Sequence, residues 1–388
     1  MKKGPSAPTP QRLGAGPCRG AEGQTAEVTS RAESLLAGPR GRRLCLSLVQ
    51  DLTGWSGWPA LTWSDGPHGR QIGRLDPVRA HESLAADVAT TDLACVGAPE
   101  RLLDALMASV DQARYWQPPD EVDQVLADDD VAALLTPVAA AVVRAPASQW
   151  WATPVDLADQ HAVVWPAGEP PEHPAPRTSG TRDALDSWRA NTLADEERAA
   201  WERPGDPAAP YSGSWWSVPA FTGGAVTSRA LPGVVEAAGG VARSAPVGLV
   251  LVEDEMGWET ARTWPVRPPA AVRVHEVTGP PAWAALVERY PLEVTAARRH
   301  DWYRTTGWEG RWAIPDWAAA AGDFDAVHLT VDGYLSTAGR AVPVPGSDAR
   351  TVLAGAAPDA TWWLADVPLG EPTDWRRAQG DLPRWAPA

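Results

Sequence analysis

Tryptophan dominates the aromatic residues of this chain, with 22 Trp against 5 Tyr and 2 Phe in 388 residues. An indole has a broad flat face and one N–H donor, so it suits half-buried walls and stacking clefts. Core packing is the alternative role. Ile, Asn and Lys are scarce while Ala, Gly, Pro and Arg are abundant, which indicates a GC-rich bacterial genome, and such a genome also favours the Trp codon. The chain is therefore expected to build either an indole-lined cleft or a core packed with indoles.

Composition and charge exclude several kinds of protein. With 34 basic and 49 acidic residues the formal net charge is -15, which argues against nucleic acid as a partner because phosphate-backbone binding needs a basic face. The length predicts two or three domains of about 100–200 residues. Cysteine occurs only at Cys18, Cys45 and Cys95, without a Cys-x-x-Cys pair, so we expect neither a disulfide framework nor a cysteine-based zinc site.

No segment has the pattern of a secretory signal or a membrane span. The basic start, Met1-Lys2-Lys3, is not followed by an apolar stretch. The longest apolar run, residues 131–143, is interrupted by Pro137 and is too short to cross a bilayer. The expectation is a soluble cytoplasmic protein without a membrane partner.

The first half of the chain has a helical pattern. Residues 1–25 are rich in Gly, Pro and polar side chains and are predicted to form a disordered tail. Residues 26–165 are predicted to form a helical domain, in which one helix begins at Pro99 and another is capped by Thr136. Residues 166–210 are interpreted as a Pro-rich linker with short helices.

The second half, residues 211–388, has a mixed pattern. Residues 247–252 predict a strand buried on both faces, and residues 327–331 alternate like a half-exposed strand. Further strands are expected at residues 272–277 and 361–364, with a helix beginning near Pro280. The predicted fold class is α+β: a mainly helical N-terminal region followed by a mixed α/β domain with a small sheet.

The lysine content gives the firmest chemical exclusion. Lysine occurs only at Lys2 and Lys3, in the segment expected to be disordered, so none is expected inside the fold. This excludes P-loop nucleoside triphosphatases, protein kinases, pyridoxal-phosphate enzymes, Schiff-base aldolases and Ser-Lys hydrolases, whose chemistry needs a lysine. The His-Glu-x-x-His and Gly-x-Ser-x-Gly motifs and the zinc deaminase signature are absent as well.

Residues that can carry proton transfer gather between Arg298 and Asp332. The candidate catalytic residues are His300, Asp301, Asp325 and His328, because histidine titrates near neutral pH and a neighbouring carboxylate can orient its ring. Each has an ordinary alternative: a loop histidine bonded to backbone for His300, and a solvated sheet face for His328. No metal site is predicted, since the spacing matches no known set of ligands.

Candidate ligand-binding residues surround this window. Small polar residues beside paired indoles suit the gripping of a sugar or a base, and arginines suit an anion. The candidates are Trp216, Ser217, Arg298, Arg299, Trp302 and Trp312. The acidic turn Glu253-Asp254-Glu255 follows the predicted strand 247–252; a solubility role is favoured for it over a ligand site at the end of a strand.

Several motifs in the last third of the chain resemble an uncharacterised family of actinobacterial proteins. They are Tyr290-Pro291-Leu292-Glu293-Val294-Thr295, Arg299-His300-Asp301-Trp302, Ile314-Pro315-Asp316-Trp317, Phe324-Asp325-Ala326-Val327-His328-Leu329-Thr330, Gly333-Tyr334-Leu335 and residues 354–363. This resemblance implies no particular activity.

A looser similarity connects the chain with small bacterial domains of ADP-ribosyltransferase-like fold. The matching pieces are Trp216-Ser217, residues 272–277, Tyr290, Asp316-Trp317 and residues 325–327. The similarity implies NAD as a ligand. The catalytic Glu of that group has no counterpart here, because Glu253 and Glu255 come too early in the order of elements.

Three functions remain open at the level of sequence. The favoured one is a small-molecule-binding protein in which the candidate residues meet at one indole-lined cleft of the C-terminal domain. Its most specific form has NAD or another nucleotide as the ligand. The alternatives are a protein–protein interaction module anchored by exposed indoles and a structural protein without an active centre. Whether the chain is an enzyme is left open.

Overall fold

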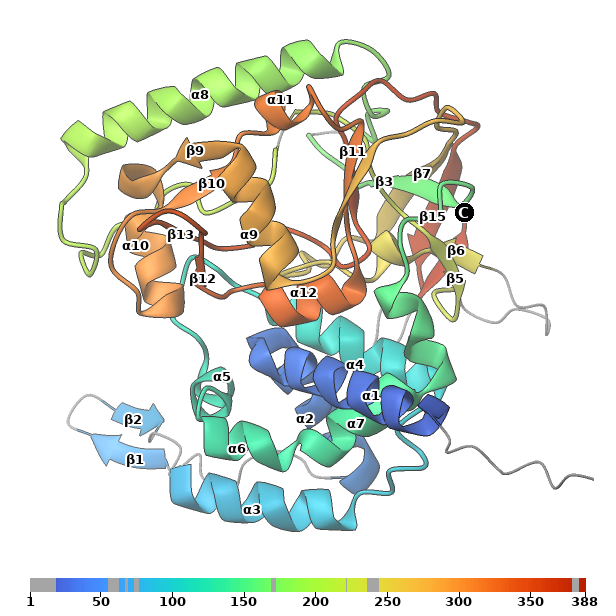
Figure 1. The fold of residues 1–388 in the computed structure, drawn as a ribbon, viewed down its shortest axis with the longest axis vertical. Helices are drawn as coiled ribbons and strands as arrows, with labels where there is room; N and C mark the ends of the chain where they lie inside the picture. The colour runs from blue at the N-terminus through green and yellow to red at the C-terminus, as the bar shows by residue number, and fades with distance from the viewer. Residues whose placement is uncertain are drawn as a thin grey trace, which may run out of the picture.

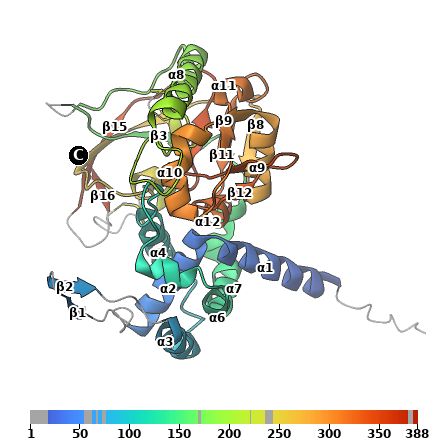
Figure 2. The same ribbon diagram turned by 90° about the vertical axis from the view of Figure 1, so that its left-hand side faces the viewer.

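The computed structural model describes residues 19–54, 63–66, 69–72, 77–168, 172–220, 222–235, 244–378 and 384–388. Its helical N-terminal part lies below a part built around an eight-stranded sheet, as Figures 1 and 2 show. The predicted α+β class is confirmed. The predicted disordered tail falls mostly on residues 1–18, which lie outside the described residues, while a helix covers the chain from Arg19 onward.

The N-terminal part consists of packed helices and one small hairpin. The helices are α1 (Arg19–Ala37), α2 (Pro39–Thr53), α3 (Pro77–Thr90), α4 (Pro99–Asp111), α5 (Glu121–Leu126), α6 (Asp129–Leu134), α7 (Thr136–Arg144) and the 3-10 helix η1 (Pro146–Ala152); the hairpin pairs β1 (Trp63–Gly66) with β2 (Gly69–Ile72).

Local sequence explains the position of helix α4. In α4 the buried residues Leu103, Leu106 and Val110 recur on one face and Pro99 lies in the first turn, as predicted. The predicted cap of α7 was wrong by one residue, because the N-cap is Leu135 and the Thr136 hydroxyl donates to the carbonyl of Ala133.

The large sheet is mixed. Its strands follow the order β16 (Trp385–Pro387), β15 (Thr373–Arg377), β7 (Thr260–Val266), β3 (Gln160–Val164), β4 (Val226–Ser228), β14 (Thr361–Trp363), β11 (Ala326–Leu329) and β8 (Val274–Val277). β8 and β11 are parallel, and the other neighbours in the sheet are antiparallel. Strand β3 precedes the segment interpreted as a linker, yet it lies between β7 and β4. The sheet therefore combines a strand that precedes residues 166–210 with strands that follow them.

Helices and short two-stranded sheets cover the large sheet. The helices are α8 (Thr181–Glu202), α9 (Pro280–Arg289), α10 (Thr295–Thr306), α11 (Trp317–Ala320) and α12 (Val331–Thr337). The short pairs are β5 (Ala230–Pro232) with β6 (Ser244–Pro246), β9 (Pro291–Glu293) with β10 (Ala313–Pro315), and β12 (Val342–Pro343) with β13 (Arg350–Thr351). Helix α8 runs along the end of the molecule opposite the helical part (Figure 1).

Of the predictions for residues 166–388, three were confirmed and three were wrong. The expected strands at 272–277 and 361–364 and the helix near Pro280 are present as β8, β14 and α9. Residues 247–249 form a 3-10 helix instead of a strand. Residues 331–337 form α12, so β11 ends at Leu329, and β11 is buried along its whole length rather than half-exposed. In the predicted linker, α8 is one continuous helix of 22 residues instead of short helices.

The two parts share a hydrophobic core. One cluster of buried side chains includes Leu44 and Leu106 of the helical part and also Leu335, Val277 and Trp302 of the sheet part. Within the described part of the chain, none of the helices combines the length and apolar character that a membrane crossing requires.

The turn between α1 and α2 packs directly on α12. A Cβ at Gly38 would lie 2.1 Å from the carbonyl oxygen of Leu335 and 2.9 Å from the backbone of Ser336. Real side-chain atoms do not approach backbone so closely, so glycine at this position allows the helical part to contact α12. The contact leaves no room for even one added carbon.

We predict that Gly38→Ala lowers the free energy of unfolding by about 2 kcal/mol or more, because the added methyl group forces the turn away from α12. Urea unfolding curves measure the change. Gly205→Ala is the matched control, since a Cβ there meets no atom within 4 Å. Equal stability of the two variants would contradict the packing described here.

Candidate functional site

Helix α10 carries five of the predicted site residues, and four of them hold the segment 204–217. His300 is 2% exposed, and its Nε2 lies 3.1 Å from the carbonyl oxygen of Pro204. The indole N–H of Trp302 donates to the carbonyl of Trp215 at 3.0 Å. Burial lowers the pKa of His300, and the positive charge of Arg299 lowers it further. The ring therefore anchors the loop as a neutral group.

Asp301 organises the same loop through its carboxylate. It accepts hydrogen bonds from the hydroxyl of Ser212 and the backbone N–H of Gly213, both at 2.8 Å, and pairs with Arg304. These bonds involve both carboxylate oxygens of a side chain that is 1% exposed. We name residues 211–217 the Ser-Trp loop; Asp301 is a positioning residue for it.

His328 belongs to a separate buried network. Its Nδ1 lies 2.6 Å from the Glu276 carboxylate, and its Nε2 lies 3.4 Å from that of Asp359. Asp359 also accepts from the backbone N–H and the Nε of Arg229, at 2.8 and 2.7 Å. Burial alone lowers the pKa of His328, but the bonds and charges of Asp359 and Glu276 outweigh it and raise that pKa. The ring stabilises the junction of β8, β11 and β14.

The half-exposed strand predicted at residues 327–331 ends at Leu329, so Thr330 does not share a sheet face with His328. Thr330 caps α12 by accepting the backbone N–H of Gly333 at 2.9 Å. Asp332 lies in α12 and pairs with Arg31 at 2.8 Å. The prediction was wrong because a capping threonine converts the end of the strand pattern into a helix start.

Asp325 pairs with Arg273 and not with His328. Its carboxylate accepts from the Arg273 backbone N–H at 2.9 Å and from the guanidinium at 2.8 Å. The hydrogen bond from that guanidinium lowers the pKa of Asp325. The pair joins the beginnings of the parallel strands β8 and β11. Throughout the described ranges, no three His, Cys, Asp or Glu side chains gather in a way that could hold a metal ion.

Of the predicted ligand-binding residues, some belong to the hydrophobic core and two line a hollow. Trp302 and Trp312 are 0% and 1% exposed and meet edge to face, with ring centroids 5.2 Å apart. The Ser217 hydroxyl bonds the backbone of Ala354 in both directions, at 3.1 and 2.9 Å. Arg299 donates to the carbonyl of Ala296. Only Trp216 and Arg298 lie together at the wall of a hollow.

That hollow, the α8 hollow, has a volume of about 420 Å³ and lies between α8 and the Ser-Trp loop. Arg298 is 5% exposed and donates to the carbonyl of Trp216 at 3.3 and 3.2 Å. Its Nη1 lies 3.8 Å from Oδ2 of Asp195. Burial lowers the pKa of Arg298 to about 10 despite the opposing charge of Asp195. The Nε and Nη2 atoms of the guanidinium fix the loop, whereas Nη1 faces Asp195 without making a hydrogen bond.

The other side of Trp216 faces a second hollow of about 290 Å³, which we name the indole hollow. Its walls include three indoles, from Trp165, Trp215 and Trp216, together with Ser228 and the segment 355–358. It has one ionisable group, the carboxyl of Glu253. None of the four predicted catalytic residues lines either hollow within the described structure.

Glu253 is held by three donors. Its Oε1 accepts from the hydroxyls of Tyr115 and Tyr334 at 2.9 and 2.8 Å, and its Oε2 accepts from the backbone N–H of Ala356 at 3.1 Å. Burial raises the pKa of this carboxyl to about 8, although the two tyrosine hydroxyls act in the opposite direction. At neutral pH the group is therefore mostly protonated, unlike an ordinary glutamate.

The sequence contained no signal that singled out Glu253. Its tyrosine partners are 138 and 81 residues away in the chain. The acidic neighbours Asp254 and Glu255 gave the segment the pattern of a solvated turn, yet they pair with Arg114 and Arg377. Only the fold shows that one of three adjacent acidic residues turns inward.

We predict that His328→Gln lowers the free energy of unfolding by on the order of 2 kcal/mol at pH 6, because Glu276 and the buried Asp359 lose their charged hydrogen-bond partner, while Arg229 still pairs with Asp359. The loss should shrink as the pH rises through the raised pKa of His328, since the wild-type ring then loses its charge. Urea unfolding at pH 6 and pH 9 tests this. His161→Gln is the control, because His161 pairs with Asp159 at a more exposed position; similar losses for both variants would argue against the buried network.

Known proteins offer no analogy for this site: no family model, no curated protein and no solved structure matches the chain. The resemblances to the actinobacterial family and to ADP-ribosyltransferase-like domains therefore stay predictions.

Proposed function

We propose that this protein binds a small molecule with a flat or sugar-like ring in the indole hollow, where the Glu253 carboxyl donates a hydrogen bond or a proton to it. The observation that carries the proposal is the meeting of three indole side chains with one carboxyl held by two tyrosines. Mostly apolar walls with a few fixed polar groups are the usual composition of small-molecule sites.

The indole walls are held in place by neighbouring rings. Trp165 stacks on Trp258 with centroids 4.6 Å apart and planes 10° apart. Trp215 stacks on Trp216 with centroids 4.4 Å apart. Walls that are already fixed lose little conformational entropy when a ligand binds, which favours affinity.

Gly355 allows Trp216 to take its position. A Cβ on Gly355 would lie 2.2 Å from Cδ1 of the Trp216 ring, and the residue has φ +75°, which favours glycine. The edge of the ring therefore rests directly on backbone. The next peptide N–H along the chain, that of Ala356, is the one that binds Glu253, so one short segment positions both the ring and the acid.

The charge of the hollow limits the ligand. Among the described residues that line it there is no arginine or histidine, and Glu253 is mostly uncharged at neutral pH. A phosphate placed there would have no counter-charge. The volume of about 290 Å³ is near the lower end of ligand sites. A nucleobase, a nicotinamide ring or a monosaccharide fits these limits, and only the ring end of NAD would lie in this hollow.

A protonated carboxyl near neutral pH suits general acid–base chemistry as well as binding. A carboxylic acid donates one hydrogen bond, and it can pass that proton to a ligand atom within reach. The proposal therefore includes an enzyme that protonates its ligand, with Glu253 as the acid.

The distribution of indoles favours this proposal over an interaction module. Among the large hydrophobic side chains of the described residues, Trp201 is the exposed indole, at 86%. A single protruding ring on α8 does not form the clustered aromatic patch of a typical interface centre.

We predict that members of a panel of nucleobases, nucleosides, nicotinamide, NAD and monosaccharides stabilise the protein. A ligand at about 100 times its dissociation constant should raise the free energy of unfolding by about 2.7 kcal/mol. Thermal shift and tryptophan fluorescence measure binding. Trp216→Phe should weaken it at least about tenfold, while Trp201→Phe, an exposed indole outside the hollow, should not. Absence of binding by every panel member, or equal effects of the two variants, would count against the proposal.

The raised pKa of Glu253 predicts a pH-dependent difference between Glu253→Gln and the wild type. Between pH 4.5 and pH 8, Glu253 loses its proton in the unfolded chain but keeps it in the folded protein. The free energy of unfolding of the wild type therefore falls over this interval. Glutamine does not titrate, so the free energy of unfolding of the variant should rise by on the order of 4 kcal/mol relative to that of the wild type from pH 4.5 to pH 8. Urea unfolding across this range tests it; parallel pH curves would refute the protonated state.

A further inference from the structure

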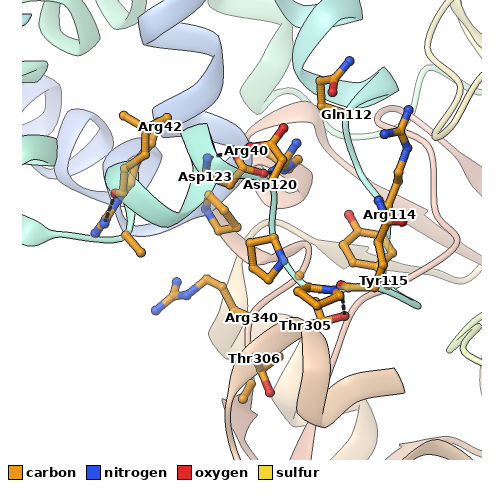
Figure 3. Close-up of a pocket in the computed structure, with 18 of the residues that line it drawn as sticks. Arg40, Arg42, Gln112, Arg114, Tyr115, Asp120, Asp123, Thr305, Thr306 and Arg340 are labelled. Carbon is orange, nitrogen blue, oxygen red and sulfur yellow. Dashed lines mark hydrogen bonds and ion pairs between the residues drawn. The ribbon is translucent and has the colours of Figure 1, made fainter. Parts of the chain in front are cut away.

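A third hollow lies at the junction of the helical part and the sheet part, and it has the opposite electrostatic character. Its volume is about 380 Å³, and it lies between α2, residues 112–127, the end of α10 and residues 339–350 (Figure 3). Five arginines line it, against two acidic residues: Arg40, Arg42, Arg114, Arg340 and Arg350 against Asp120 and Asp123. We name it the arginine hollow. Such an excess is unusual in a chain with formal net charge -15.

The two acidic side chains of the hollow are already neutralised. Asp123 pairs with the buried Arg40, and both Asp120 and Asp123 pair with Arg43, at 3.0 and 3.1 Å. They leave no negative charge for the remaining arginines. Two of those, Arg42 and Arg114, pair with carboxylates outside the lining, at 2.8 and 3.0 Å.

Arg340 and Arg350 have no such partner. Within the described ranges, no carboxylate lies within ion-pair distance of either guanidinium. Arg340 donates one N–H to the carbonyl of Ser336 at 2.8 Å. In Figure 3 its side chain extends from the side of Thr306 toward that of Arg42. Partial burial lowers the pKa of Arg340, and the charge of Arg42 lowers it further. An anion between these groups would relieve both effects.

Arg350 is fixed by an aromatic ring. Its guanidinium carbon lies 4.9 Å from the ring centroid of Trp308, and one N–H donates to the carbonyl of Ala341 at 3.4 Å. Stacking holds the planar group in place. Its other N–H donors have no protein acceptor among the described residues, so they are available to a ligand.

We propose that the arginine hollow binds the phosphate group of a small metabolite, with Arg340 and Arg350 as its main ligands. Guanidinium groups bind phosphate oxygens in pairs of hydrogen bonds, which gives both affinity and orientation. This site is separate from the indole hollow, where no cation is available, and it does not depend on the function proposed there.

The test is calorimetric titration of the intact protein with inorganic phosphate and with glycerol 3-phosphate, at constant ionic strength, with glycerol as a negative control that has no ring for the indole hollow. We expect both phosphates to bind and glycerol not to bind. Tighter binding of the ester assigns the site to a phosphorylated metabolite, and equal binding assigns it to free phosphate. Absence of phosphate binding overturns the proposal.

Matched variants locate the binding. Arg340→Gln and Arg350→Gln should each weaken phosphate binding at least about tenfold. Arg289→Gln should not, because Arg289 is an exposed arginine that pairs with Asp323 outside the hollow. Arg340→Gln should leave the melting temperature of the ligand-free protein unchanged or raised, since it removes a like charge beside Arg42. Equal affinity in all three variants, or a loss of binding that only follows a loss of fold, contradicts the assignment.

Discussion

The carboxyl of Glu253 connects the main parts of this molecule. One oxygen accepts from Tyr115, which follows α4 in the helical part, and from Tyr334, which lies in α12. The other accepts from the segment that supports Trp216. An uncharged carboxyl can be buried at this position at moderate energetic cost, because every bond it accepts replaces a bond to water. The helical part, the sheet part and the indole walls are thereby aligned around one group.

Arginine supplies every long cation of the described fold, and its geometry fits the tasks that it has here. Arg229 uses its planar group to join Asp359, Thr153 and the carbonyl of Pro154. Arg298 spans Trp216 and Asp195 from a buried position. A fork of several donors can serve several acceptors at once, whereas an ammonium is a single compact charge. A chain without internal lysine can therefore still bury cations between its elements.

Sequence analysis succeeded where structure depends on near neighbours and failed where it depends on distant ones. The spacing of Leu103, Leu106 and Val110 was sufficient for α4 because the partners of a helix face lie within a few turns. The apolar run at 247–252 had the composition of a strand, but the chain bends after Pro246 into a 3-10 helix. At the site, Trp216 and Arg298 were recognised from their local pattern. Glu253 and Trp165 were not recognised, because the side chains that contact them come from distant parts of the chain.

The position of β3 has a consequence for how the chain is made. This strand pairs with β7, which is synthesised about 100 residues later, and with β4, about 65 residues later. On the ribosome, β3 must wait for both partners, so the sheet cannot close until most of the polypeptide has emerged. During that interval β3 has no strand partner, and the helical part that precedes it in the chain is the part of the fold already synthesised.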